Sequence, residues 1–264
     1  MRKNNVLRDL IDAGKPTIGT HLFTQWPGMV EVVGHTGVMD YIEFSGQYAP
    51  YDLFSLENFG RAIDIFEHMS SLMKLDQEPR TYLAERAIGS GIQNVLFADI
   101  RTVADAKEGV SAVRPETPDV GGRGGVASTR DTGYVYPASY TMDDYINSLN
   151  GAVVAIMVEK KPCVDNLEEI LSVGGIDMVQ FGPGDYSMSI GKYPSDPEVK
   201  TAEKYTIETC LKMGIRPRAE ISGWEEAKPY IDMGVLDFCI GSDVNTVYSY
   251  CLEQGEQMAK AVGR

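Results

Sequence analysis

Two acidic residues follow apolar stretches of the sequence and could bind a metal together. Glu159 comes directly after the run at 152–158, and Asp185 follows the run at 178–181 and the segment Gly182-Pro183-Gly184. A carboxylate is costly to bury unless it is paired, and glycine lets the backbone come close to an oxygen-rich ligand. Two carboxylates from adjacent strands, completed by water and a chelating substrate, suit Mg²⁺ or Mn²⁺. The alternative is that both acids cap helices, and the spacing leaves both open.

Other polar residues also close apolar runs. They are His21, Ser45, Lys74, Asp76, Asp99, Glu220 and Asp243. A histidine titrates near neutral pH, so His21 could act as a catalytic base, or it could be a hydrogen-bonded strand residue. We expect Asp99 and Asp243 to be structural, and the sequence leaves Asp76 and Glu220 undecided.

The elements that must position these residues are short apolar runs that alternate with longer amphipathic segments. Eight such runs occur, at 17–23, 41–44, 72–75, 95–100, 152–158, 178–181, 216–221 and 238–240. Several of the helix-like segments end at glycine, as at Gly214 and Gly234, which suits a left-handed C-cap. This alternation predicts one (β/α)8 barrel domain over residues 1–264. A doubly wound sheet is the alternative, but no G-x-G-x-x-G fingerprint follows the first run.

One segment interrupts the alternation. Residues 114–145 are too long and glycine-rich for an ordinary connection, so we expect a loop insertion at about 115–140. Long loops are often functional, and this one follows the fourth run and carries Arg123 and Arg130. We therefore predict that Arg123 binds substrate. A surface excursion or a subunit contact is the alternative.

Composition narrows the class of protein. The 264 residues are 43% hydrophobic and 23% charged, which is ordinary for a globular chain. A formal net charge of −14 argues against nucleic acid and anionic membranes as partners. The N-terminal stretch lacks a long apolar run, so neither a signal peptide nor a membrane span is expected. Four cysteines without metal-type spacing indicate reduced thiols in a cytoplasmic protein.

Several of these strings resemble the HpcH/HpaI aldolase family, pyruvate-dependent class II aldolases. The strongest are MVEK at 157–160 and NLEEILSVGGIDMVQFGPGDYSMSIG at 166–191. TIGTHLF at 17–23, GQYAPYD at 46–52, GIQNVLFADI at 91–100 and GSDVNT at 241–246 extend the similarity over most of the chain.

The resemblance implies a (β/α)8 barrel of the phosphoenolpyruvate/pyruvate type, commonly a hexamer (a trimer of dimers that exchange their last helix). It implies that Glu159 and Asp185 bind a divalent ion, Mg²⁺ or Mn²⁺, and that Gly182 and Gly184 help to hold the substrate carboxylate. The ion would polarise a 2-oxo acid and stabilise its enolate, which leaves an aldehyde or attacks one.

The sequence departs from the family pattern where protons are moved. In the family motif D-x-E-H-A-P the histidine transfers the proton. Here Ser45 stands in place of the aspartate, Gln47 of the glutamate and Tyr48 of the histidine, and Gly89 stands where a second aspartate is expected. Tyr48 is a poor base but a good hydrogen-bond donor to an alkoxide, so we expect it to contact the substrate. Simple packing near the rim of the barrel is the alternative.

The third run departs as well. Lys74 is the cation nearest to the position of a substrate-binding arginine, with Arg80 as a weaker alternative. Lysine supplies a positive charge but no bidentate fork. His21 and Tyr48 remain the candidate catalytic residues.

Three functions fit these observations. The first is a divalent-metal-dependent carbon–carbon lyase, an aldolase that cleaves or forms 4-hydroxy-2-oxo acids. A metal-dependent decarboxylase, isomerase or hydrolase acting on a 2-oxo acid would not need the missing residues. A non-catalytic 2-oxo acid binding protein is the third.

Overall fold

Eight parallel strands close into a barrel in the order in which they occur along the chain. The structure is a computed structural model that describes residues 4–135 and 137–264. The strands are β1 (Thr17–Leu22), β2 (Tyr41–Ser45), β3 (Ser70–Leu75), β4 (Asn94–Phe97), β5 (Val154–Val158), β6 (Met178–Phe181), β7 (Arg216–Ile221) and β8 (Asp237–Ser242). Each of the eight predicted runs overlaps one of them. Pairing of β1 with β8 completes the circle, which confirms the predicted (β/α)8 barrel.

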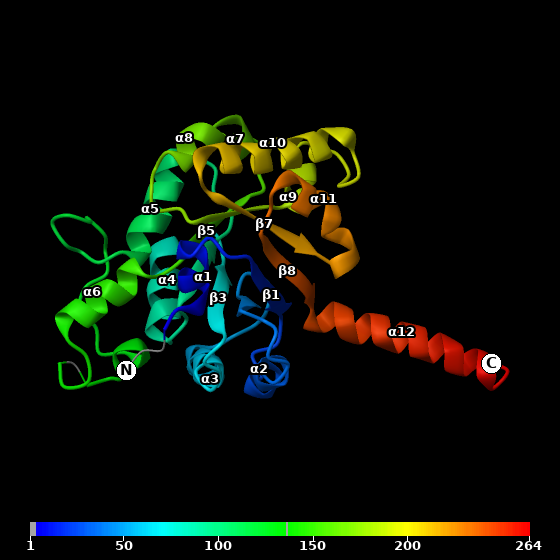
Figure 1. Ribbon diagram of the computed structural model, residues 1–264, viewed down its shortest axis with the longest axis horizontal. Helices are drawn as coiled ribbons and strands as arrows, with labels where there is room; N and C mark the ends of the chain where they lie inside the picture. The colour runs from blue at the N-terminus through cyan, green and yellow to red at the C-terminus, as the bar shows by residue number, and fades with distance from the viewer. Residues whose placement is uncertain (1–3, 136) are drawn as a thin grey trace.

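The helices lie around the barrel, most of them on its outside (Figure 1). They are α1 (Val6–Asp12), α2 (Pro27–Gly34), α3 (Leu53–Ile63), α4 (Arg80–Gly89), α5 (Val103–Val113), α6 (Met142–Asn150), α7 (Lys161–Asp165), α8 (Leu167–Leu171), α9 (Pro183–Ser189), α10 (Pro197–Met213), α11 (Lys228–Met233) and α12 (Asp243–Ala261). As the glycines predict, α10 and α11 end where Gly214 and Gly234 take φ values of 73° and 99°.

The strands are buried on both faces, which explains why their sequences are nearly continuous apolar runs. Outward-facing residues such as Phe44 pack on helix residues such as Phe59, with ring centroids 5.4 Å apart. A second apolar cluster fills the lower part of the barrel: Leu7, Tyr41, Leu72, Leu96, Val153, Ala155, Met157 and Met178.

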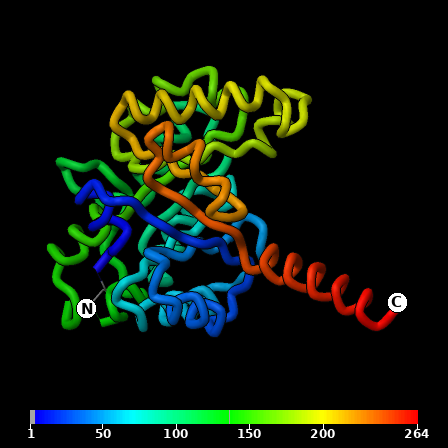
Figure 2. The backbone as a smooth tube through the Cα atoms, turned by 45° about the vertical axis from the view of Figure 1, so that its right-hand side comes forward, coloured from blue at the N-terminus to red at the C-terminus, as the bar shows by residue number. Residues whose placement is uncertain are grey.

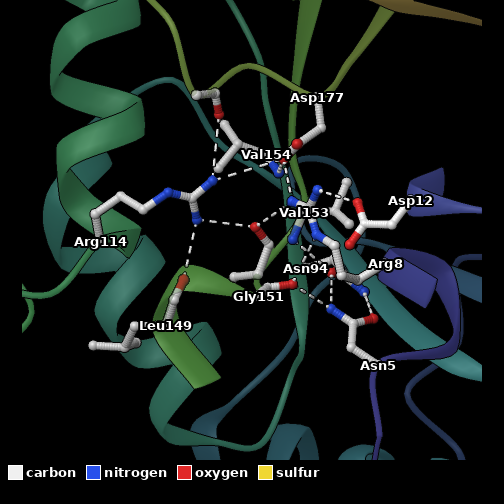
Figure 3. A network of polar contacts seen from close by, with 12 residues as sticks. Asn5, Arg8, Asp12, Asn94, Arg114, Leu149, Gly151, Val153, Val154 and Asp177 are labelled. Carbon is white, nitrogen blue, oxygen red and sulfur yellow. Dashed lines mark hydrogen bonds and ion pairs between the residues drawn. The ribbon is translucent and has the colours of Figure 1, made fainter. Parts of the chain in front are cut away.

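The amino-terminal end of the barrel is closed by α1 and the residue before it. Figure 3 shows the polar network there. Arg8 donates to Asp177 at 2.6 Å, Asn5 donates to Asn94 at 2.7 Å, and Arg114 binds the carbonyl oxygen of Ala152 at 2.9 Å. These contacts seal this end, so a ligand must enter at the carboxyl ends of the strands.

The glycine-rich segment between α5 and α6 lies outside the barrel (Figure 1). It holds one short 3-10 helix, η1 (Arg130–Thr132), and a bridge between Pro115 and Gly124. Arg130 forms an ion pair with Asp64, which follows α3. This segment therefore packs on the helices near α3 and α4.

The last helix, α12, extends away from the barrel (Figures 1 and 2). None of its residues, all of which the structure describes, is buried. Its apolar side chains include Val244, Val247, Tyr248 and Leu252, which are 54%, 57%, 66% and 47% exposed.

The cysteines are free thiols, with Cys251 exposed and the other three buried. In the described parts of the chain, no helix combines the length and the apolar character needed to cross a membrane.

Candidate active site

A cavity of about 520 Å³ opens at the carboxyl ends of the strands. It is lined by all but one of the candidate site residues: His21, Tyr48, Lys74, Glu159, Gly182, Gly184 and Asp185. These residues lie far apart in the sequence, and the strand ends bring them together. The place of this cavity is the one expected for the active site of a barrel enzyme.

Glu159 directly follows β5, and Asp185 lies in the first turn of α9, which follows the adjacent strand β6. Glu159 is 1% exposed, and its Oε1 accepts the backbone N–H of Asp99 at 2.7 Å. Burial raises the pKa of Glu159, and the negative charge of Asp185 adds to this, while Lys74 and the Asp99 N–H act in the opposite direction. A cation between the two acids would offset the cost of this burial.

Position 182 beside Glu159 requires glycine. A Cβ atom on Gly182 would lie 2.7 Å from the Cβ of Glu159, closer than real Cβ contacts, and 3.1 Å from its Oε2, which is tighter than most. A Cβ atom on Gly184 would meet nothing within 4 Å, so this backbone faces open space. The Gly182-Pro183-Gly184 segment thus leaves room for a ligand next to Glu159.

Lys160 is a site residue that the sequence analysis missed. Its Nζ lies 2.5 Å from Asp185 Oδ1 and 3.8 Å from Asp99 Oδ1. Asp99 was expected to be structural, and it does hold Arg101 through two hydrogen bonds of 2.9 and 3.0 Å. It also reaches the site, because its φ of 53° turns its N–H toward Glu159. The signal for Lys160 was its place directly after Glu159.

The two acids have the donor chemistry that a divalent ion needs. Both offer hard oxygen ligands, and a positive group, the Lys160 ammonium, already lies against Asp185. No third His, Cys, Asp or Glu of the described residues completes a metal-binding group with them. The residues therefore fit an ion whose remaining ligands are water and substrate, provided that Lys160 moves away from Asp185.

Lys74 and Tyr48 lie against each other in the lining of the same cavity. Lys74 Nζ lies 3.4 Å from the Tyr48 hydroxyl and 4.8 Å from the centre of its ring. Burial opposes the charge of Lys74, but Glu159, Tyr48 and Glu43 outweigh it and raise the pKa of this ammonium group. Lys74 is thus a cation in the cavity, able to attract a carboxylate.

The interior of the barrel below the cavity carries charges in place of the usual branched apolar residues. Arg218 forms a fully buried ion pair with Glu43, and its Nε donates to the Tyr41 hydroxyl at 2.8 Å. Gly19 makes room for this arrangement, because a Cβ atom there would lie 2.3 Å from the ring of Tyr41. This ion pair could not be predicted from the sequence, because it joins two strands that lie far apart along the chain.

His21 lies between the buried ion pair and the cavity. Its two ring nitrogens are each 3.5 Å from a carboxylate, Nε2 from Glu43 and Nδ1 from Glu220. Glu220, which the sequence left undecided, also accepts from the amide of Gln180 at 2.6 Å. Burial would raise the pKa of Glu220, but the hydrogen bond and charge of His21, with Arg218 and Lys74, lower it to about 2.

Arg123 lies outside this cavity lining. Its guanidinium donates to Thr81 at 2.8 Å and lies 3.9 Å from Glu108, on the outside of α4 and α5. Substrate binding by Arg123 stays a prediction. The position of a loop relative to a barrel depends on tertiary packing, which sequence pattern does not reveal.

Solved structures of other proteins have the same fold. The structure of an HpcH/HpaI aldolase/citrate lyase family protein from Burkholderia cenocepacia is similar with a TM-score of 0.85 and 24% identity, covering 99% of this chain and 100% of the other. The HpcH/HpaI aldolase from Desulfitobacterium hafniense gives a TM-score of 0.85 and 19% identity, with 96% of each chain covered. At these identities the likeness establishes the fold.

The sequence itself is similar to a 4-hydroxy-2-oxo-heptane-1,7-dioate aldolase from Klebsiella pneumoniae. The two are 28% identical over 244 residues, which is 91% of this chain and 88% of the relative. Residues 62–247 match the sequence model of the HpcH/HpaI aldolase/citrate lyase family. This match spans well over half of the chain and includes Glu159, Asp185 and Glu220. The chain therefore belongs to the HpcH/HpaI aldolase/citrate lyase family, a family of lyases.

Proposed function

We propose that this protein is a divalent-metal-dependent carbon–carbon lyase that cleaves or forms 4-hydroxy-2-oxo acids. Its small-molecule partners are a 2-oxo acid, such as pyruvate, and an aldehyde. The observation that carries this proposal is the convergence of Glu159 and Asp185 on one cavity, beside a glycine segment that leaves room for a ligand. The name of the Klebsiella relative supports the substrate class.

Mg²⁺ or Mn²⁺ would be held by the carboxylates of Glu159 and Asp185. When bound, such an ion supplies a Lewis acid that draws electrons from the 2-oxo group. The chain supplies the rest: the Gly182–Gly184 backbone and the Lys74 ammonium bind the substrate carboxylate, and the Tyr48 hydroxyl donates to the oxygen that becomes the alkoxide or aldehyde.

Tyr48 and Lys74 cannot do all of the proton chemistry. Lys74 stays charged because the carboxylates around it raise its pKa, so it binds anions and does not accept protons. His21 lines the same cavity and titrates in the useful range. We therefore assign proton transfer to the side of the cavity that holds His21.

The chain also has a surface that suits assembly with copies of itself. Helix α12 projects from the barrel and carries exposed apolar residues (Figure 2). We infer that a second copy of the chain covers them, in a homo-oligomer such as a trimer of dimers. Large exposed apolar areas of this kind mark interaction sites.

The proposed activity is tested by following pyruvate release from a 4-hydroxy-2-oxo acid, with Mg²⁺ or Mn²⁺ and after chelation. We expect turnover that depends on the metal and that falls at least about 100-fold in the Glu159→Gln variant, because one of two ligand carboxylates is lost. Calorimetry with the same ions should show weaker binding by this variant. Release of carbon dioxide from oxaloacetate with no cleavage of any hydroxy-oxo acid would favour a decarboxylase instead.

A further inference from the structure

A cluster of charged residues lies at the floor of the cavity and has no part in the proposed metal site. We refer to His21, Glu43, Arg218 and Glu220 as the His21 cluster. They come from β1, β2 and β7, and the side chains of Glu43 and Arg218 are 1% and 0% exposed. Burial of so many charges is costly unless they are paired, so their arrangement needs a reason.

The imidazole of His21 is placed to carry a positive charge. Its Nε2 and the Oε1 of Glu43 lie 3.5 Å apart, and neither atom has a hydrogen-bond partner among the described residues. Its Nδ1 faces Glu220 Oε1, also at 3.5 Å. A neutral imidazole has one N–H group and can serve one carboxylate, whereas the imidazolium has two and serves both.

The other charges around His21 agree with this. Charged groups on two strands act on it: Glu43 of β2, and Arg218 and Glu220 of β7. Burial and the charge of Arg218 oppose protonation of His21, but Glu43 and Glu220 outweigh them and raise its pKa. Arg218 acts weakly here because its own charge is already paired with Glu43.

Glu220 connects His21 with the cavity. Its side chain is 44% exposed and lines the same cavity as Glu159 and Lys74. One carboxylate oxygen accepts from Gln180 at 2.6 Å, and the other faces His21. Glu220 is thus fixed in orientation, open to a ligand on one side and in contact with an imidazolium on the other.

We propose that Glu220 and His21 transfer the proton in this active site, an inference that rests on the proposed lyase function. In the cleavage direction, His21 gives its Nδ1 proton to a carboxylate oxygen of Glu220. Glu220 then gives a proton to carbon 3 of the enolate: the new C–H bond takes the electron pair of the enolate, and the O–H pair returns to Glu220. The C4 hydroxyl becomes the aldehyde carbonyl as the C3–C4 bond breaks and gives its proton to water, and neutral His21 regains a proton from that water. The products are the 2-oxo acid, the aldehyde, ionised Glu220 and protonated His21. The synthetic direction reverses these steps.

This assignment gives each member of the cluster a distinct task. Glu220 is a catalytic residue because it meets the substrate, and His21 holds the proton between turnovers. Glu43 and Arg218 are positioning residues that fix the imidazole from below. The pair Glu220–His21 takes over the task of the histidine whose place Tyr48 occupies.

The experiment measures exchange of the methyl protons of pyruvate for deuterium, by NMR in deuterium oxide with Mg²⁺. Glu220→Gln and His21→Asn should each lower the exchange rate at least about 100-fold, the usual size of a general acid–base contribution. Their affinity for Mg²⁺, measured by calorimetry, should stay within about twofold of that of the unaltered protein, since neither residue is a metal ligand. Glu225→Gln, the same change at an exposed residue outside the cavity, is the matched control and should leave exchange unchanged.

A second readout concerns His21 directly. The chain has three histidines, so its imidazole signals can be titrated and the signal of His21 identified by its loss in His21→Asn. We expect a pKa above the ordinary 6.5, and a lower value in Glu220→Gln. This titration tests the contact between the two groups, and the exchange rate tests their part in proton transfer.

The outcomes separate the two proposals. Full exchange by Glu220→Gln and His21→Asn would overturn the proton relay and leave the lyase function in place. A pKa of His21 at or below 6.5 would also overturn the relay. Absence of exchange in the unaltered protein with Mg²⁺ bound would overturn the lyase function, and the relay with it.

Discussion

The buried ion pair between Glu43 and Arg218 gives the sharpest prediction about stability. The Glu43→Gln change keeps the shape of the side chain but removes its charge, which leaves the guanidinium of Arg218 uncompensated where its side chain is 0% exposed. Removal of one partner of a buried pair costs about 3–5 kcal/mol. In a chain of this size each kcal/mol lowers the melting temperature by about 2–4 °C, so we expect a loss of about 6–20 °C.

Thermal unfolding followed by circular dichroism measures this loss. The matched control is Asp165→Asn, the same chemical change in the surface pair Lys161–Asp165, whose side chains are 52% and 51% exposed. It should cost less than about 1 kcal/mol. A double variant, Glu43→Met with Arg218→Met, should recover much of the loss, because no charge is then left unpaired. If the free energy of unfolding of Glu43→Gln is within about 1 kcal/mol of that of the unaltered protein, the ion pair is not buried as described.

Three further predictions each concern one residue. The Lys160→Met variant should bind Mg²⁺ about five- to tenfold more tightly in calorimetry. The reason is that the Lys160 ammonium competes with the ion for Asp185, and its ion pair contributes about 1 kcal/mol. Equal or weaker binding would contradict this competition. The pKa of His21 is raised in the folded protein because Glu43 and Glu220 outweigh the effect of burial, so its stabilising effect is complete below pH 6.5 and is lost as the pH rises through the raised value. His21→Asn should therefore lower the melting temperature more at about pH 5.5 than at about pH 8.5, and a larger loss at the higher pH would refute the sign. Tyr248→Glu on α12 should reduce the mass of the particle in light scattering while the secondary structure persists, and an unchanged mass would show that this residue lies outside any subunit interface.

The fold could be predicted because its signals are local. Each strand is a short apolar run, and the barrel follows from their regular alternation with helices. Glu159 and Asp185 were also recognisable, because an acid at or shortly after the end of an apolar run can be seen without knowledge of the neighbouring strands. Their convergence follows from the common direction of parallel strands.

The charged interior could not be predicted in the same way. Glu43 and Arg218 lie far apart in the sequence, and each lies within a run that otherwise has the pattern of an ordinary strand. The acid inside YIEFS at 41–45 and the two arginines of RPRAEI at 216–221 were the available signals. They indicate polar positions on a buried strand but not their partners, since those depend on closure of the barrel. The same limit applies to Lys160, whose contact with Asp185 joins two strand ends.

The most direct test of the lyase account compares the unaltered protein with Glu159→Gln in deuterium oxide containing pyruvate, with and without Mg²⁺ or Mn²⁺. The proton NMR signal of the pyruvate methyl group reports whether carbon 3 loses and regains protons. The account predicts loss of this signal in the unaltered protein with metal, and at least about 100-fold slower loss with Glu159→Gln or without metal. Exchange that is equally fast without metal, or in Glu159→Gln, would contradict the assignment of Glu159 and Asp185 as the metal site.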